Sequence, residues 1–236
     1  MSVAELVKDF IGLFYPEVCL CCGEELGVKE EFVCTMCMYK LPKTNFHKTQ
    51  NNPLAKVFWG RVELDSVAAY CHYQKGNTVQ ELVHEIKYNG KKELGVYLGK
   101  HYGFDLKGFE VFNKVDALVY IPLHPKKLKK RGYNQSAYFA EGLPQSMGVP
   151  ILHNAISRIK NTDTQTRKSR YERWENVEGI FKVEMATELK GKHVLLVDDV
   201  ITTGSTIEAC AHELIKAGVG KVSVAAIGSA DTISSI

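Results

Sequence analysis

Long apolar runs are missing from this chain, since no stretch approaches the roughly 18 consecutive apolar residues that a membrane-spanning helix needs. A strong charge imbalance is missing too. The 30 basic and 27 acidic side chains leave a formal net charge of +3, which is too small to indicate nucleic acid by itself. Glu5, Lys8 and Asp9 interrupt the apolar N-terminus, so it does not resemble a secretion signal. We therefore expect a cytoplasmic protein without a membrane span.

The composition is that of an ordinary globular protein. Of the 236 residues, 45% are hydrophobic and 24% are charged, and this length suffices for one well-buried core. Apolar residues in the first 16 positions recur at helical spacing. This pattern favours a short helix that packs on its own protein over a helix that lies on a membrane surface.

Five of the seven cysteines gather in one short stretch. Cys19 and Cys22 form one C-x-x-C pair, Cys34 and Cys37 form another, and Cys21 is left over. Two such pairs can supply four thiolates to a tetrahedral Zn²⁺ ion with no open position for chemistry. Two disulfides are the alternative, but a reducing compartment argues against them. The spacing predicts a structural zinc site.

The composition changes after this cysteine-rich stretch. A polar segment at 41–56 indicates a boundary between an N-terminal helix and zinc-binding element at 1–45 and a second domain at 55–236. In the second domain, apolar segments alternate with amphipathic ones, which predicts an α/β fold with a parallel sheet flanked by helices. The expected strands cover residues 65–73, 115–123, 150–153, 193–200 and 221–228, and the expected helices cover 78–88, 91–104, 135–142 and 205–217.

The segment HVLLVDDVITTGSTIEA, residues 193–209, combines an apolar strand, two acids, a hydroxyl-rich loop and a helix. Ligands of parallel sheets bind beyond the carboxyl ends of the strands. A helix N-terminus there offers unpaired backbone N–H groups and a partial positive charge to a phosphate. The predicted phosphate-binding residues are Thr202, Thr203, Gly204, Ser205 and Thr206.

Two carboxylates beside a phosphate site need an explanation, because they repel phosphate. Asp198 and Asp199 suit a ligand that also carries adjacent hydroxyl groups, as a ribose does. They would also attract a divalent cation on other phosphates of the ligand. The alternative is that the two acids merely end a strand and begin a turn. We predict a ribose-phosphate ligand.

These residues carry a resemblance to known families. VLLVDDVITTGST resembles the phosphoribosyl pyrophosphate (PRPP) signature of type I phosphoribosyltransferases, and the phosphate motifs G-x-x-x-x-G-K-[ST] and G-x-G-x-x-G after a strand are absent. The double C-x-x-C, HEIKYNGKKELG, IPLHPKKLKKRGYNQS and VLLVDDVITTGST, in this order, resemble the ComF/GntX family. The resemblance covers most of the chain. It implies a type I phosphoribosyltransferase-like sheet with a small zinc-ribbon-like N-terminal element.

The resemblance also implies roles for individual residues. Asp198 and Asp199 would act on the ribose hydroxyls, and the threonine-rich loop would bind the 5′-phosphate. Mg²⁺ and nearby cations would balance the charge of the leaving pyrophosphate. A solvated surface run is the alternative for the lysines that follow residue 125. The implied pyrophosphate contacts are Leu123, His124, Lys127 and Arg131.

A basic polar segment spans residues 158–181. It includes Arg158 and a T-x-x-Q-T-like core that contains Thr164 and Gln165. In the family such a loop would close over PRPP and exclude water. A disordered connection is the alternative.

Two classes of function agree with these residues. The first is Mg²⁺-dependent phosphoribosyl transfer to an unknown acceptor, although neither an acceptor pocket nor a general base is evident. The second follows from the association of the family with DNA uptake in competent bacteria. A non-catalytic accessory protein would then bind single-stranded DNA, or DNA-uptake proteins, through its basic segments and through Tyr133, Tyr171 and Trp174.

Overall fold

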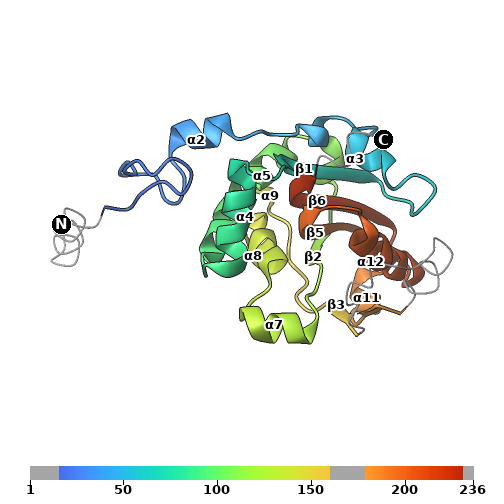
Figure 1. The fold of residues 1–236 in the computed structure, drawn as a ribbon. Coiled ribbons are helices and arrows are strands. Elements are labelled where there is room, and N and C mark those ends of the chain that lie inside the picture. Colours follow the sequence, from blue (N-terminus) through green and yellow to red (C-terminus); the bar gives the residue numbers. More distant parts are fainter. Residues whose placement is uncertain (1–15, 160–178, 231–236) are drawn as a thin grey trace.

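A four-stranded parallel sheet lies at the centre of the molecule in a computed structural model that describes residues 16–159 and 179–230 (Figure 1). Its strand order is β1-β6-β5-β2, and each neighbouring pair is parallel. The predicted parallel sheet is therefore confirmed. Its strands are β1 (Ser66–Tyr73), β2 (Ala117–Tyr120), β5 (His193–Ile201) and β6 (Lys221–Ala230), and a separate antiparallel ribbon joins β3 (Ile156–Arg158) to β4 (Phe181–Val183).

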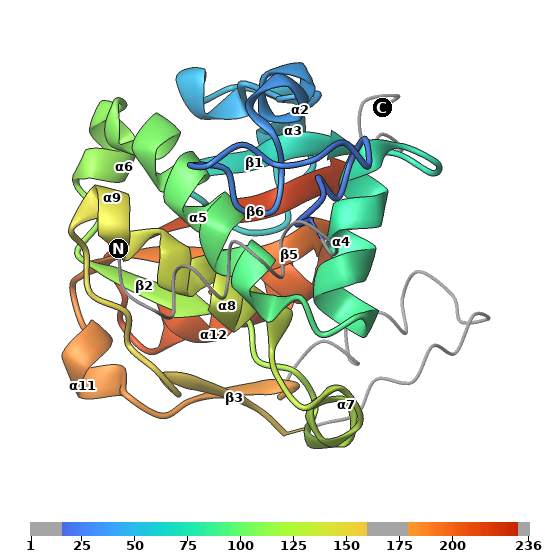
Figure 2. The ribbon, with the colours of Figure 1, turned by 90° about the vertical axis from the view of Figure 1, so that its left-hand side faces the viewer.

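Helices cover both faces of the sheet. Figure 2 looks onto the face that carries α4 (Thr78–Tyr88), α5 (Lys92–Lys107) and α8 (Gln135–Gly142), while α12 (Ser205–Lys216) packs behind it. None of the helices in the described part of the chain is long and apolar enough to cross a membrane. The remaining helices are α2 (Thr35–Lys40), η1 (Phe46–Lys48), α3 (Pro53–Lys56), α6 (Glu110–Asn113), α7 (Pro125–Arg131), α9 (Pro144–Met147) and α11 (Ala186–Leu189).

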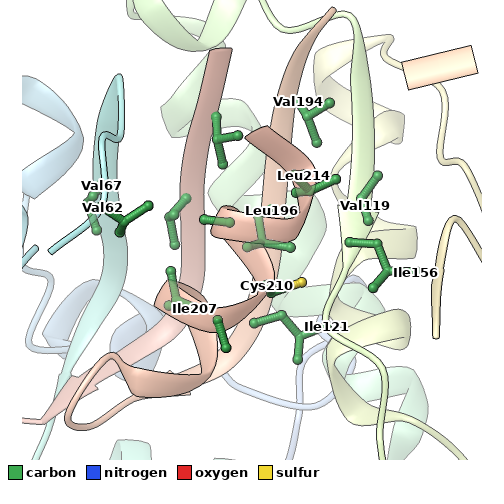
Figure 3. Packing of buried hydrophobic residues seen from close by; sticks show 14 of the residues in the cluster. Val62, Val67, Val119, Ile121, Ile156, Val194, Leu196, Ile207, Cys210 and Leu214 are labelled. Atoms are coloured by element: carbon green, nitrogen blue, oxygen red, sulfur yellow. The ribbon is translucent and has the colours of Figure 1, made fainter. Parts of the chain in front are cut away.

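The apolar strand sequences are explained by burial on both faces. Val194 and Leu196 of β5 belong to the cluster with Cys210 of α12, which Figure 3 shows. Leu195 and Val197 belong to the cluster on the α5 and α8 side. Successive strand residues point to opposite faces, so a strand between two helical layers needs an unbroken apolar run. Each such buried side chain stabilises the fold by about 1.5–3 kcal/mol.

Close packing of α5 on α8 fixes the position of α8 over the sheet. Gly99 of α5 faces the α8 backbone, and a Cβ atom there would lie 2.1 Å from the carbonyl oxygen of Phe139. Only glycine allows this approach. The contact matters for function because the N-terminus of α8 carries Gln135 and Ser136, which contact the acidic pair of β5.

The cysteine-rich segment packs against α5. Cys19 and Val33 belong to the same buried cluster as the α5 side chains. The hydroxyl of Tyr97 donates a hydrogen bond to the carbonyl oxygen of Val33 at 3.3 Å. The Phe32 ring meets the Tyr97 ring edge-on, with centroids 5.7 Å apart.

The chain then joins the open edge of β1. Residues 42–44 run beside this strand, and the backbone N–H of His72 donates to the carbonyl oxygen of Pro42 at 2.8 Å. The connection between the predicted units 1–45 and 55–236 contains η1 and the start of α3. The division into two domains stays a prediction.

Two expected strands differ in the structure. The strand predicted at 150–153 is a single bridge, in which Ile151 pairs with Leu118. The strand predicted at 115–123 shortens to β2, since the pairing with β5 ends after Ile121 and Pro122 has no N–H group to donate. In both places a proline limits the ladder that the apolar pattern alone would extend.

Candidate functional site

The acidic pair lies near the carboxyl end of β5, where the ends of several elements meet. The N–H of Ile121, just after β2, donates to the carbonyl oxygen of Val197 at 2.9 Å. The side-chain amide of Asn134 donates to the carbonyl oxygen of Ile121 at 2.9 Å. Asn134 also caps α8, because its Oδ1 accepts from the N–H of Ser136 at 3.0 Å. The N-terminus of α8 is thereby held beside the acidic pair.

Asp199 is buried and saturated with hydrogen bonds. Its side chain points toward α4 and α8, where Oδ2 lies 2.7 Å from Nζ of Lys87 and accepts from Nε2 of Gln135 at 2.8 Å. Its Oδ1 accepts from the N–H of Val200 at 2.6 Å. With a residue exposure of 7%, Asp199 is enclosed by protein partners.

Asp198 has a different environment from its neighbour. Its Oδ1 accepts from the hydroxyl of Ser136 at 3.0 Å and from the N–H of Asp199 at 2.8 Å. Burial, together with the negative charge of Asp199, raises the pKa of Asp198 to about 7. Asp198 therefore gains or loses its proton near neutral pH.

The hydroxyl-rich loop connects the acidic pair to α12. Gly204 adopts a left-handed conformation with φ of +76° and begins α12 without a side-chain cap. A Cβ atom on Gly204 would lie 2.7 Å from the Phe58 ring, so both backbone angle and space require glycine. The first N–H groups of α12 face outward with a partial positive charge. The side chains exposed around them are Thr202, Thr203, Ser205 and Thr206.

Arg61, which is distant in the sequence, fixes this loop through hydrogen bonds. Nη1 of Arg61 donates to the carbonyl oxygen of Thr203 at 3.1 Å, and Nε donates to Oε2 of Glu208 at 3.1 Å. The Nη2 atom of Arg61 also bonds Glu208. These contacts could not be predicted from the sequence, because Arg61 and Glu208 are 147 residues apart and no motif links them.

The predicted pyrophosphate segment lies between β2 and α7. Leu123 and His124 are partly exposed there, and Nδ1 of His124 caps α7 by accepting from the N–H of Lys126 at 3.2 Å. Lys127 is exposed on α7. The basic run thus forms a helix, since Pro125 occupies the first helical position, where its missing N–H costs nothing.

Arg131 links the end of α7 to the acidic pair. Its Nη1 donates to Oε1 of Gln135, whose Nε2 in turn donates to Asp199. The guanidinium also lies over the Tyr88 ring, 5.3 Å from its centroid. Gln135 alone therefore separates Arg131 from Asp199 in this chain of hydrogen bonds.

The predicted closing loop is described only at its ends. Arg158 of β3 lies over the Phe181 ring of β4 at 5.5 Å. Burial lowers the pKa of Arg158, and the negative charge of Asp198 opposes that shift. The N–H of Ile159 donates to the carbonyl oxygen of Ile180 at 2.9 Å, which closes the ribbon at its outer end. The further predicted residues Thr164, Gln165, Tyr171 and Trp174 lie outside the described residues.

Two contacts of the acidic pair were absent from the sequence predictions. Lys87 occurs in HEIKYNGKKELG, and Ser136 ends RGYNQS, so both belong to blocks of the family resemblance. That membership is the signal that could have identified them. The hydroxyl of Tyr133 donates to the carbonyl oxygen of Ile86 in α4, and its stacking on DNA stays a prediction.

The four predicted metal ligands come together. The sulfur atoms of Cys19, Cys22, Cys34 and Cys37 all lie within 4.8 Å of one another. Burial alone would raise the pKa of Cys19, but backbone N–H donors, among them that of Cys34 at 3.3 Å, lower it to about 6. A thiolate is therefore favoured at neutral pH, and the cluster can hold a metal ion.

Cys21 stands apart from this cluster, as the spacing predicts. Burial, followed by the charge of Cys19, raises the pKa of Cys21 to about 12. Cys71 and Cys210 are buried thiols elsewhere in the core. Cys21 thus provides a chemically similar but non-clustered comparison for the four ligands.

Comparisons with known proteins agree with this geometry. Residues 135–230 match the phosphoribosyl transferase domain family. Competence protein F of Haemophilus influenzae is 36% identical over 110 residues, which cover 46% of this chain and 48% of that protein. DNA utilization protein YhgH of Escherichia coli is 27% identical over 233 residues, which cover 90% of this chain and 96% of that protein.

Shorter or weaker similarities complete these findings. Competence protein ComFC of Bacillus subtilis is 32% identical over 101 residues, which cover 43% of this chain and 39% of that protein. Among solved structures, purine phosphoribosyltransferase from Pyrococcus horikoshii covers 56% of this chain at 20% identity, with 74% of its own chain aligned and a TM-score of 0.35.

Proposed function

The chain belongs to the ComF family, and we propose that it binds PRPP or another ribose phosphate. This binding would contribute to DNA uptake or processing. The observation that carries the proposal is the adjacency of two acids to a hydroxyl-rich helix N-terminus. Ser136 and Asp199 hold Asp198 at one side of the site, and Gly204 opens α12 at the other. Hydrogen-bond acceptors for the ribose hydroxyls and hydrogen-bond donors for the phosphate therefore lie close together.

Each part of the ligand has a matching set of groups in this arrangement. The 5′-phosphate would accept from the N-terminal N–H groups of α12 and from the exposed hydroxyls of Thr202, Thr203, Ser205 and Thr206. The acidic pair would accept from the ribose hydroxyls. His124, Lys127 and Arg131 would face the pyrophosphate, and Mg²⁺ bound with PRPP would neutralise part of its charge.

Transfer of the phosphoribosyl group is the reaction that such a site would support. Displacement at the anomeric carbon of the ribose breaks its bond to pyrophosphate, and an acceptor nucleophile forms the new bond. Arg131 would stabilise the charge of the departing pyrophosphate.

We also propose that the four-cysteine cluster holds a structural Zn²⁺ ion. Four sulfur ligands without a water position are typical of structural zinc rather than catalytic zinc. The pKa of Cys19, lowered to about 6, supports metal binding near neutral pH. A cytoplasmic location, also proposed, would keep these thiols reduced.

A second candidate function is single-stranded DNA binding without catalysis, and one surface favours it. The lysine side chains of α7 are exposed, and the ring of Tyr88, which is 66% exposed, lies beside Arg131. Backbone charge and base stacking would combine there. DNA affinity should fall steeply between 50 and 200 mM salt, as about 10³-fold losses are usual when several phosphates are contacted. Ribose-phosphate binding should change far less.

The ribose assignment is tested by comparing ribose 5-phosphate with 2-deoxyribose 5-phosphate. If carboxylates accept from both hydroxyls, loss of the 2′-hydroxyl should weaken binding about tenfold, because a charge-assisted hydrogen bond contributes about 1.5–3 kcal/mol. The Asp198→Asn, Asp199→Asn double variant should bind both sugars equally weakly. Equal affinities in the wild-type protein would contradict the ribose assignment.

A further inference from the structure

The site has an electrostatic conflict that the proposed function must overcome. Two adjacent carboxylates stand one short loop from the proposed phosphate position. At about 7 Å, two unit charges repel each other by roughly 2 kcal/mol at an effective dielectric constant near 20. A doubly charged phosphate would therefore be repelled strongly unless one carboxylate is neutralised by the protein.

Lys87 supplies that neutralising charge. Its Nζ lies 2.7 Å from Oδ2 of Asp199, and the exposed fractions of the two side chains are 20% and 10%. An ion pair with so little exposure is screened weakly by solvent. Gln135 donates a hydrogen bond to the same oxygen but carries no charge.

The packing of α4 fixes the position of Lys87. It lies in the last turn of α4, directly after the buried Ile86. The carbonyl oxygen of Ile86 accepts from the hydroxyl of Tyr133, which precedes α8. The end of α4 and the start of α8 are therefore tied together on either side of Asp199.

The strand geometry gives Asp198 and Asp199 different surroundings and therefore different roles. Asp199 points to the α4 and α8 face, where Lys87, Gln135 and the N–H of Val200 occupy its oxygens. Asp198 accepts from Ser136 and from the N–H of Asp199 through Oδ1, and this residue is more exposed than Asp199.

We propose that Lys87 is a positioning residue of the ribose-phosphate site. Its ammonium neutralises Asp199 and holds that carboxylate toward α4, so Asp198 is the acid that meets the ribose. This inference rests on the proposed function and refines it, since it assigns the two acids unequal roles. Lys87 acts through Asp199 and does not touch the ligand.

The test measures ribose 5-phosphate affinity by calorimetry in Lys87→Met, Lys87→Arg and the Lys87→Met, Asp199→Asn double variant. Lys87→Met should weaken binding about tenfold, because an unpaired Asp199 charge then repels the phosphate. Lys87→Arg should stay within about threefold of the wild type. The double variant should recover most of the loss, because the site regains its original net charge. Lys91→Met removes an exposed lysine nearby and should change affinity less than about twofold.

Each possible result has a distinct meaning. Unchanged affinity in Lys87→Met would overturn the role of Lys87 while leaving the proposed function intact. A double variant that binds more weakly than Lys87→Met would show that Asp199 itself contacts the ribose, which also overturns the inference. Failure of the wild-type protein to bind ribose 5-phosphate would contradict the proposed function, and this inference with it.

Unfolding measurements separate these effects from simple misfolding. Lys87→Met leaves a buried carboxylate unpaired, so its unfolding midpoint in urea should fall. Adding Asp199→Asn should restore the midpoint. A midpoint loss that persists in the double variant would indicate a packing role and contradict charge compensation.

Discussion

Asp198 and Asp199 are sequence neighbours that the strand turns toward different surroundings. Asp199 meets Lys87 and Gln135 under the helices of one face, whereas Asp198 accepts from the hydroxyl of Ser136. Burial first, and the charge of Asp199 second, raise the pKa of Asp198 to about 7. One D–D dipeptide therefore provides two acids with different chemistry.

The raised pKa of Asp198 predicts how stability depends on pH. Between about pH 4 and pH 7 the folded protein holds a proton that the unfolded chain, with a pKa near 4, has lost. The free energy of unfolding should therefore fall as pH rises through this window. Asp198→Asn stays neutral and should remove about 2–4 kcal/mol of this fall, measured by urea unfolding at pH 5 and pH 8. An unchanged slope in the variant would contradict the assignment.

Gly204 allows a matched comparison at the phosphate loop. Gly204→Ala should cost the left-handed strain of about 1–2 kcal/mol and an added clash with the Phe58 ring. Gly76→Ala has a similar φ of +81° but no atom within 4 Å, so it should cost the strain alone. Urea unfolding of the two variants measures the difference, which should exceed about 1 kcal/mol. Equal losses would mean that the loop moves freely away from Phe58.

The residues of the site differ in how far they could be predicted. Asp198, Asp199 and the loop to Thr206 are contiguous, so their adjacency follows from the sequence once the strand and helix are recognised. Lys87 and Arg61 reach the site only through tertiary packing, and no local pattern encodes that distance. Their roles became visible only with the fold.

Individual helices and strands also differ in how far they could be predicted from the sequence. The helices at 78–88 and 135–142 have the predicted bounds, since polar caps and apolar spacing agree there. Helix α7 was not predicted, because its basic sequence has no apolar face that would mark a helix. The ribbon β3–β4 escaped prediction because its strands are only three residues long and enclose a polar segment.

The cysteine element should depend on its metal as a unit. Cys34→Ser removes one of four ligands, so zinc content measured by atomic absorption should fall well below that of the wild type. Cys21→Ser alters a thiol outside the cluster and should leave zinc content unchanged. Proteolysis of Cys34→Ser should begin in the segment before residue 42, while the thermal midpoint of the sheet domain stays within a few degrees of that of the wild type. Full zinc content in Cys34→Ser would refute the four-thiolate site.

The basic helix α7 should act on the pyrophosphate end of the ligand. Arg131→Ala should weaken pyrophosphate binding about tenfold and ribose 5-phosphate binding less than about threefold, because the guanidinium would face the leaving group. Lys130→Ala, which removes an exposed neighbour on the same helix, serves as the control. Calorimetric titration with each ligand gives both numbers. Equal losses for the two ligands would count against a place for Arg131 at the pyrophosphate.

At the scale of the whole molecule, the parallel sheet creates the site. Alternating apolar and amphipathic segments predicted this class of fold, since apolar strands need helices on both faces. The order β1-β6-β5-β2 could not be predicted, because local patterns do not say which strands become neighbours. That order places β5 between β6 and β2, so its acidic end meets Ile121 and the N-terminus of α8.

The most direct measurement is calorimetric titration of PRPP with Mg²⁺ into the wild-type protein and into the Asp198→Asn, Asp199→Asn double variant. Saturable binding by the wild type and its loss in a folded double variant are the results that this account predicts. Absence of binding to the wild type, or equal affinity in the two proteins, would contradict a ribose-phosphate site at the carboxyl end of β5.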